Sequence, residues 1–327
     1  MGNLYIGYRR QEGASDLASQ LHHVLGIYCT SRIYGCRLFH LHFDKVDEFV
    51  SMNEIQALNH FLSIKIDPVD ISSFGPNIYY CDSPEPLLLE RLKSVALTSE
   101  LNVALLMTHP FAAIAPESIS YILAKNKIDG LSVARYLDFF PAEMCNIISE
   151  PPSGFVVGIH LPKYTPNFSK AIPDWSYQGL YGLCKNLLDD TAELGIQCRF
   201  RVVVDALTTS AEASSGELPM SDEGASEPPR FSGEIGWFFD SVEAIGSLEV
   251  CINRHPISSL CNLALSDIVV IAESPLSYVA AIAGMSKIVV SSDNSRQSLP
   301  SWLSWNGLTG EFERCGFLEI IKNSGIK

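Results

Sequence analysis

The sequence is poor in positive charge, and several familiar catalytic motifs are missing from it. The 327 residues contain 23 Lys and Arg against 37 Asp and Glu, which gives a formal net charge of −14. A broad phosphate-binding face is therefore not expected, and nucleic acid is excluded as a partner. The chain has no G-x-G-x-x-G after its first predicted strand, no G-x-x-x-x-G-K-[ST], no G-x-S-x-G and no H-E-x-x-H. These absences disfavour nicotinamide dehydrogenases, P-loop enzymes, serine hydrolases of the elbow type and zincins.

Paired cysteines, a secretory leader and an uninterrupted apolar run are also missing. None of the nine cysteines has C-x-x-C spacing, so we expect reduced thiols rather than a zinc site or a disulfide framework. The first eleven residues show no apolar segment behind a basic start, which favours a cytoplasmic location. The most apolar long stretch, residues 268–290, contains Glu273, Pro275 and Lys287, so no membrane span is expected.

A D-x-D pair that would hold a nucleotide-bound metal is absent as well. The nearest candidates, such as Asp44 with Asp47 and the adjacent Asp189 and Asp190, have the wrong spacing. His40 and His42 share one face of a predicted strand but lack a third ligand at readable spacing. We therefore expect a site without a metal and without a cofactor.

What the chain does contain is an alternation of short β-branched runs with segments of helical period, which is typical of parallel sheets covered by helices. The predicted strands fall into two series, 3–8, 37–43, 77–81 and 102–107, then 155–160, 199–205, 248–252, 267–272 and 287–291. Between the series, EPPSG at 150–154 sustains neither helix nor central strand. The sequence therefore predicts an α/β protein with two Rossmann-like domains, 1–150 and 151–327, whose parallel sheets face a cleft.

Two helices stand out in this pattern. Ser15 or Asp16 caps the first, an amphipathic helix that places one apolar face on the first sheet; that face comprises Leu17, Leu21, Val24, Leu25 and Tyr28. The second runs from Trp175 to Leu194, has Asp174 as its expected cap, and ends at Gly195.

Residues 209–231 are dominated by Ser, Gly, Pro and acids. This composition predicts a mobile loop, and both a tolerated insertion and a lid at the carboxyl edge of the preceding strand remain open.

The most informative segment is ALSDIVVIAESPLSYVAAIAGMSKIVV at 264–290. A strand leads into Ser274, Pro275 and Ser277, and Pro275 suits the first turn of the helix that follows. A helix N-terminus with two hydroxyls is suited to a phosphate or diphosphate, because its dipole and free N–H groups favour an anion. The alternative is that Ser274 only caps the helix and Ser277 only packs.

This segment resembles the late donor-site motif of fucosyltransferase-like glycosyltransferases, enzymes of the GT-B type with two Rossmann domains. The matching positions are Ser274, Ser277, Tyr278, Ala280 and Ala281. Two further motifs agree in order, Ser-Gln-Leu-His at 19–22 and the strand Val-Val-Gly-Ile-His at 156–160.

The chain also departs from the family pattern. Asp16 and Ala18 replace the two glycines of the first loop, so the backbone there approaches a ligand less freely. After His160 the family has two arginines, a glycine and an aspartate, whereas this chain has Leu-Pro-Lys-Tyr-Thr. The chain therefore lacks the arginines that would bind the donor diphosphate through paired hydrogen bonds. Lys163 or Arg254 is expected to replace them.

The resemblance implies a glycosyltransferase that moves a sugar from a nucleotide-diphosphate donor, a class that includes GDP-fucose, to a glycan or lipid-linked acceptor. The donor-binding candidates are His160, Lys163, Arg254, Ser274, Ser277 and Tyr278. The catalytic candidates are the carboxylates Glu12 and Asp16, and the acceptor-side candidates are Arg9, Arg10, Gln20 and His22. Two alternatives stay open, a catalytically inactive protein that binds a glycan or a protein partner, and a pyruvyl-transfer enzyme of the same architecture.

Overall fold

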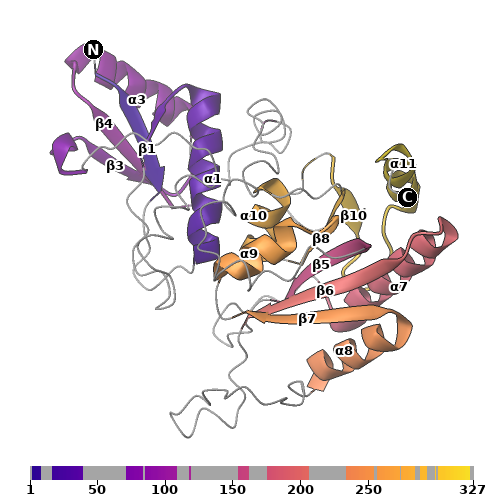
Figure 1. The fold of residues 1–327 in the computed structure, drawn as a ribbon. Coiled ribbons are helices and arrows are strands. Elements are labelled where there is room, and N and C mark those ends of the chain that lie inside the picture. The colour runs from indigo at the N-terminus through magenta and orange to yellow at the C-terminus, as the bar shows by residue number, and fades with distance from the viewer. Residues whose placement is uncertain are drawn as a thin grey trace, which may run out of the picture.

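The computed structural model describes two parallel β-sheets joined by helices (Figure 1). The described residues are 2–8, 17–39, 71–83, 85–108, 118, 154–161, 175–205, 233–253, 256–272, 274–283, 288–292, 299 and 301–324. Sheet A has the order β2-β1-β4-β3. Its strands are β1 (Leu4–Tyr8), β2 (Arg37–Leu38), β3 (Ile78–Cys81) and β4 (Val103–Met107), and every pairing is parallel.

Sheet A carries the helices α1 (Leu17–Tyr34) and α3 (Pro86–Ser99) and the short 3-10 turn η1 (Ile71–Phe74). All five residues of β1 and all five of β4 are buried, as expected for central strands of a covered parallel sheet. Val103 N donates to Asn3 O at 3.0 Å, which ties the start of β4 to the segment before β1.

Sheet B has six strands in the order β10-β9-β8-β5-β6-β7. The strands are β5 (Phe155–Leu161), β6 (Cys198–Asp205), β7 (Ser247–Asn253), β8 (Ile268–Ile271), β9 (Ile288–Ser292) and β10 (Leu303–Trp305). All five pairings are parallel. Read from β7, the order is 3-2-1-4-5-6, that of a dinucleotide-binding Rossmann sheet.

Helices cover both faces of sheet B. On one face, α7 (Tyr177–Glu193), α8 (Gly233–Ile245) and α11 (Arg314–Ser324) enclose an apolar core that includes Phe200, Phe238, Trp305 and Phe317. On the other face lie α9 (Pro256–Ala264) and α10 (Pro275–Ala283). Their core is continuous with that of sheet A, because α1 packs directly against α10 (Figure 1).

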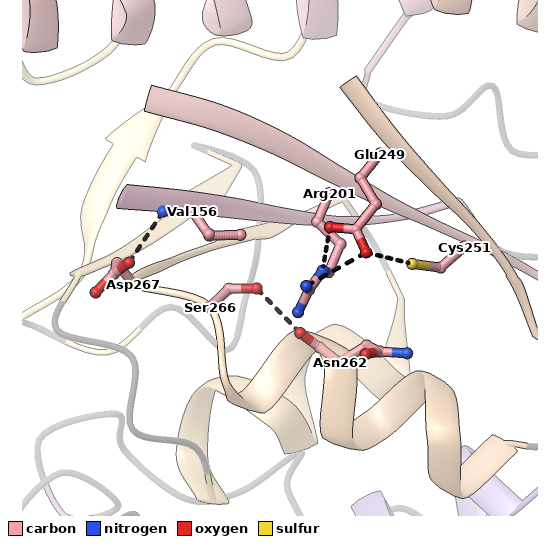
Figure 2. A network of polar contacts seen from close by, with 7 residues as sticks. All are labelled: Val156, Arg201, Glu249, Cys251, Asn262, Ser266 and Asp267. Atoms are coloured by element: carbon pink, nitrogen blue, oxygen red, sulfur yellow. Dashed lines mark hydrogen bonds and ion pairs between the residues drawn. The ribbon is translucent and has the colours of Figure 1, made fainter. Parts of the chain in front are cut away.

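Beneath α9 the core contains a polar network, drawn in Figure 2. Arg201 of β6 is fully buried and donates to Glu249 of β7 through Nε at 3.0 Å and Nη2 at 3.3 Å. Asp267 accepts from Val156 N at 2.9 Å, which joins the start of β8 to β5. Ser266 lies against Gly158, where a Cβ would stand 2.9 Å from the Ser266 Cβ, so β5 needs a glycine there. The contacts of Asp267 and Ser266 hold β5 and β8 side by side, and the Arg201–Glu249 pair joins β6 to β7.

The structure corrects three details of the sequence prediction. Helix α1 is not a one-faced amphipathic helix, since Ile27, Cys29 and Thr30 are buried together with Val24, Leu25 and Tyr28 of the predicted face. It packs against both sheet A and α10. The cap of α7 is Ser176 rather than Asp174, because the Ser176 side chain accepts from Gly179 N at 3.0 Å. Strand β10 was not predicted, since three residues give no readable alternation.

Other predictions lie partly or wholly outside the described residues. The segment 209–231 and most of the predicted boundary at 150–154 fall there, and so does the second half of the predicted strand at 37–43. The cleft between the sheets stays a prediction. Within the described ranges, no helix combines the length and the hydropathy needed to cross a membrane.

Candidate functional site

The candidate site lies where the strand order of sheet B reverses. The chain runs from β5 outward through β6 to β7, then returns to the opposite side of β5 as β8. Ligands of open α/β sheets bind outside the carboxyl ends of the strands at such a switch point. His160 is the penultimate residue of β5, and Ser274 follows the end of β8, so these two residues flank the switch point.

His160 and Ser274 contact each other directly although 114 residues separate them. His160 Nδ1 lies 2.5 Å from Ser274 Oγ, and both residues are 2% exposed. Ser274 also accepts from Ser277 N at 3.3 Å, so its hydroxyl caps the first turn of α10. Pro275 begins the helix, as the sequence predicted. The pair therefore fixes the N-terminus of α10 to the carboxyl end of β5.

Ser277 has a buried hydroxyl that no described residue satisfies. Its side chain is fully buried, and its Oγ has no hydrogen-bond partner among the described residues. A buried hydroxyl without a partner costs about 1–3 kcal/mol. The N-terminus of α10 thus offers a hydroxyl and a positive dipole end to a ligand, which is the chemistry of an anion site.

Tyr278 connects this turn to the N-terminal half. Its ring meets the His22 ring edge-on at 5.1 Å and the Trp302 ring at 5.3 Å. Burial is the main reason that the pKa of Tyr278 lies above its ordinary value, and the neighbouring Cys29 thiol adds to the effect. Tyr278 is therefore a neutral packing residue between the two halves and a poor proton donor or acceptor.

On the side of sheet A, the residues near the end of β1 also gather. Tyr8 is the last residue of β1, and its hydroxyl donates to Gln20 Oε1 at 3.4 Å. The Tyr8 and His23 rings stack with centroids 5.5 Å apart. Because His22 contacts Tyr278, this group and the α10 turn are neighbours across the α1–α10 contact.

Six of the residues singled out from the sequence lie in described parts of the chain, in the two groups described above. They are Gln20, His22, His160, Ser274, Ser277 and Tyr278. Arg9, Arg10, Glu12, Asp16, Lys163 and Arg254 lie outside the described residues, so their roles stay predictions. Sequence reasoning missed Tyr8 and Trp302. The position of Tyr8 at the carboxyl end of a predicted strand was a usable signal; Trp302 precedes a strand too short to predict.

Metal binding receives no support within the parts of the chain that the structure describes, where no group of three His, Cys, Asp or Glu residues could hold an ion. The eight cysteines in those parts are free thiols, among them the buried Cys29, Cys184, Cys198 and Cys261.

No protein-family model matches the chain, and no curated protein sequence matches it. Solved structures match most of its length. POFUT1 in complex with GDP-fucose aligns at a TM-score of 0.40 and 10% identity, covering 87% of this chain and 96% of that chain. ADP-heptose LPS heptosyltransferase II from E. coli aligns at a TM-score of 0.36 and 10% identity, covering 98% of each chain. The fucosyltransferase NodZ from Bradyrhizobium aligns at a TM-score of 0.37 and 12% identity, covering 90% of this chain and 96% of that chain.

Two of these structures are named as a heptosyltransferase and a fucosyltransferase, and the third contains GDP-fucose. The predicted fold class, an α/β protein with two parallel sheets, is confirmed by the strand order and pairing. A fold does not define an activity, so the function has to be argued from the residues themselves.

Proposed function

We propose that the chain is a glycosyltransferase that moves a sugar from a nucleotide-diphosphate sugar to a glycan or lipid-linked acceptor. One observation carries the proposal: at the switch point of a Rossmann-ordered sheet, the N-terminus of α10 holds the buried Ser277 hydroxyl, which has no partner among the described residues, next to the His160–Ser274 pair. The distal phosphate of the donor binds at this turn, where N–H groups, hydroxyls and the helix dipole all favour negative charge.

His160 and Ser274 position the phosphate-binding turn in this proposal. Their 2.5 Å contact and the Ser274 cap hold the first turn of α10 in place before a ligand arrives, which lowers the cost of ordering it. Lys163 and Arg254 follow the carboxyl ends of β5 and β7 in the sequence, and we assign to them the charge that develops on the departing diphosphate.

The acceptor binds on the side of residues 1–150, and the donor on the side of residues 151–327. Gln20 and His22 supply polar contacts from α1, with Arg9 and Arg10 after β1. Glu12 or Asp16 takes the proton of the acceptor hydroxyl. Loss of that proton makes the acceptor oxygen nucleophilic, and this oxygen forms the new glycosidic bond at the anomeric carbon of the sugar. The bond between the anomeric carbon and the diphosphate oxygen breaks, and its electron pair stays on the diphosphate.

A second candidate is a protein that keeps the donor turn but does not catalyse transfer. It is favoured by Leu161-Pro162-Lys163, which stands where the family has paired arginines. A lysine supplies only a point charge there, whereas an arginine binds phosphate through two parallel hydrogen bonds.

Calorimetric titration of the full chain with GDP, UDP and ADP tests the donor turn. The unmodified protein binds at least one of them, and Ser277→Ala weakens that binding about tenfold to a hundredfold, because a hydrogen bond to a charged phosphate is lost. Thr191→Val is the matched control, since it removes a buried hydroxyl from α7 on the opposite face of sheet B. Its affinity should equal that of the unmodified protein.

The outcomes separate the candidates. If no nucleoside diphosphate binds at millimolar concentration, the donor turn does not exist. If binding occurs and Ser277→Ala leaves it unchanged, the phosphate lies elsewhere in the protein. If the nucleotide binds but a panel of nucleotide sugars with glycan acceptors releases no nucleoside diphosphate, the non-catalytic candidate is correct.

A further inference from the structure

A cavity of about 340 Å³ lies on the face of sheet B that points away from the candidate site. It is formed where the C-terminal turns of α7 meet the β10–α11 connection, and its wall includes Asn186, Asp189, Asp190, Glu193, Glu311 and Arg314. All of these lining residues lie in the part of the chain that the structure describes. Its volume is at the lower end of the range of small-molecule pockets, so it suits a small ligand.

The charge of this wall defines the ligand. The described residues of the wall contribute four carboxylates and one guanidinium, a formal charge of −3. Asp189, Glu193 and Glu311 are exposed and stand at its rim, whereas Asp190 is buried. A cavity with this arrangement repels anions such as nucleotides and attracts cations.

Asp190 is only half satisfied. Its side chain is 5% exposed, and Oδ1 pairs with Arg314 Nε at 2.6 Å. Its other oxygen, Oδ2, has no hydrogen-bond partner among the described residues. Burial raises the pKa of the Asp190 carboxyl in spite of the attraction of Arg314. One guanidinium therefore does not compensate this carboxylate, and a second N–H donor would stabilise it.

The present contacts of Arg314 indicate which cations fit. Its guanidinium bridges two carboxylates, with Nε on Asp190 and Nη2 2.9 Å from Glu193 Oε2, so the wall already accepts a planar cation with several N–H donors. The Arg314 side chain is itself half exposed. The described carboxylates do not converge as metal ligands do.

We propose that this cavity binds a small organic cation with a guanidinium or primary ammonium group, whose N–H donors reach Asp190 Oδ2 while its charge is balanced by Asp189 and Glu311 at the rim. Asn186 Nδ2 donates to Gly310 O at 3.0 Å, so the amide oxygen of Asn186 is oriented by that bond and is a further acceptor for the ligand. The site is separate from the proposed donor turn and does not depend on it.

Titration of the full chain with agmatine, which carries one guanidinium and one ammonium group, tests the proposal. Agmatine should bind with an affinity in the millimolar range or better, and the affinity should fall as salt is raised, because the rim charges are exposed. The rim variant Asp189→Asn with Glu311→Gln should weaken binding about tenfold, and Asp190→Asn by at least as much.

Two comparisons guard against a false result. Glu319→Gln removes an exposed carboxylate of α11 outside the cavity wall, and it should bind agmatine as the unmodified protein does. Asp190 is buried, so Asp190→Asn can disturb folding; the rim variant changes only exposed side chains and decides the matter alone. The proposal is wrong if millimolar agmatine does not bind, if the rim variant binds as well as the Glu319→Gln control, or if Mg²⁺ competes with agmatine at equal concentration.

Discussion

Gly310 lies at a close backbone approach in the C-terminal half, so replacing it should be among the most destabilising single changes in the protein. Gly310 has a φ of +77°, and a Cβ placed there would stand 2.5 Å from Gly179 O, 2.5 Å from Leu183 N and 2.6 Å from Gly182 C. These are backbone atoms of α7, which cannot rotate away as the end of a side chain does. Gly310→Ala therefore forces the β10–α11 connection away from α7.

The magnitude follows from two separate costs. A non-glycine residue in the left-handed region costs about 1–2 kcal/mol. Overpacking a close contact costs about 1–3 kcal/mol more. Gly310→Ala should then lower the free energy of unfolding by about 2–5 kcal/mol, a large part of the roughly 5–15 kcal/mol that a native protein has.

Gly195 supplies the matched control. It has a φ of +72°, and a Cβ built on it meets nothing within 4 Å. Gly195→Ala therefore carries the conformational cost alone, about 1–2 kcal/mol. Urea unfolding followed by tryptophan fluorescence measures both variants, because all four tryptophans lie between residues 175 and 305 and report on the C-terminal half. Equal losses for Gly310→Ala and Gly195→Ala would refute the close approach of α7 to this connection.

Two further predictions concern buried thiols. Cys29→Leu should lower the free energy of unfolding by about 1–3 kcal/mol, because Cys29 is 1% exposed in the tightly packed helix α1; Cys315→Leu, at an exposed position, should leave it unchanged in the same urea assay. Burial raises the pKa of Cys29 and of Cys198 from 9.0 to about 12. Between these values the native state holds protons that the unfolded chain has lost, so stability should fall as pH rises from 9 toward 12 by up to about 1.4 kcal/mol per pH unit and thiol. The free energies of unfolding of the unmodified protein and of the double variant Cys29→Ala with Cys198→Ala should differ by a constant amount below pH 9. Above pH 9 this difference should change, because only the unmodified protein has the two buried thiols.

The central strands of both sheets were readable from the sequence because they are short apolar runs that are buried on both faces. Runs such as Phe155–His160 and Arg199–Asp205 have no helical period and are bounded by turns, so only a covered parallel strand accommodates them. Gly195 was readable as the stop of α7 for a similar reason, since its positive φ is a conformation that glycine adopts at little cost. Local physics decides these features.

The environment of α1 was not readable in the same way. Its apolar residues suggested one buried face, but Cys29 and Thr30, on the other side, are buried as well. Small and weakly polar residues look equally suited to a solvated surface and to a close helix contact. The partner that decides between these, α10, begins more than 240 residues later in the chain, and no local pattern encodes that meeting.

The candidate site shows the same division between local and distant information. The capping role of Ser274 follows from its place before Pro275, and the sequence contains both. The contact of Ser274 with His160 depends instead on β8 returning beside β5, which is a property of strand order. Because the α7–α11 cavity lies on the opposite face of the same sheet, the two sites share a rigid layer but no side chain. A nucleotide at the α10 turn and an organic cation against Asp190 should therefore bind independently.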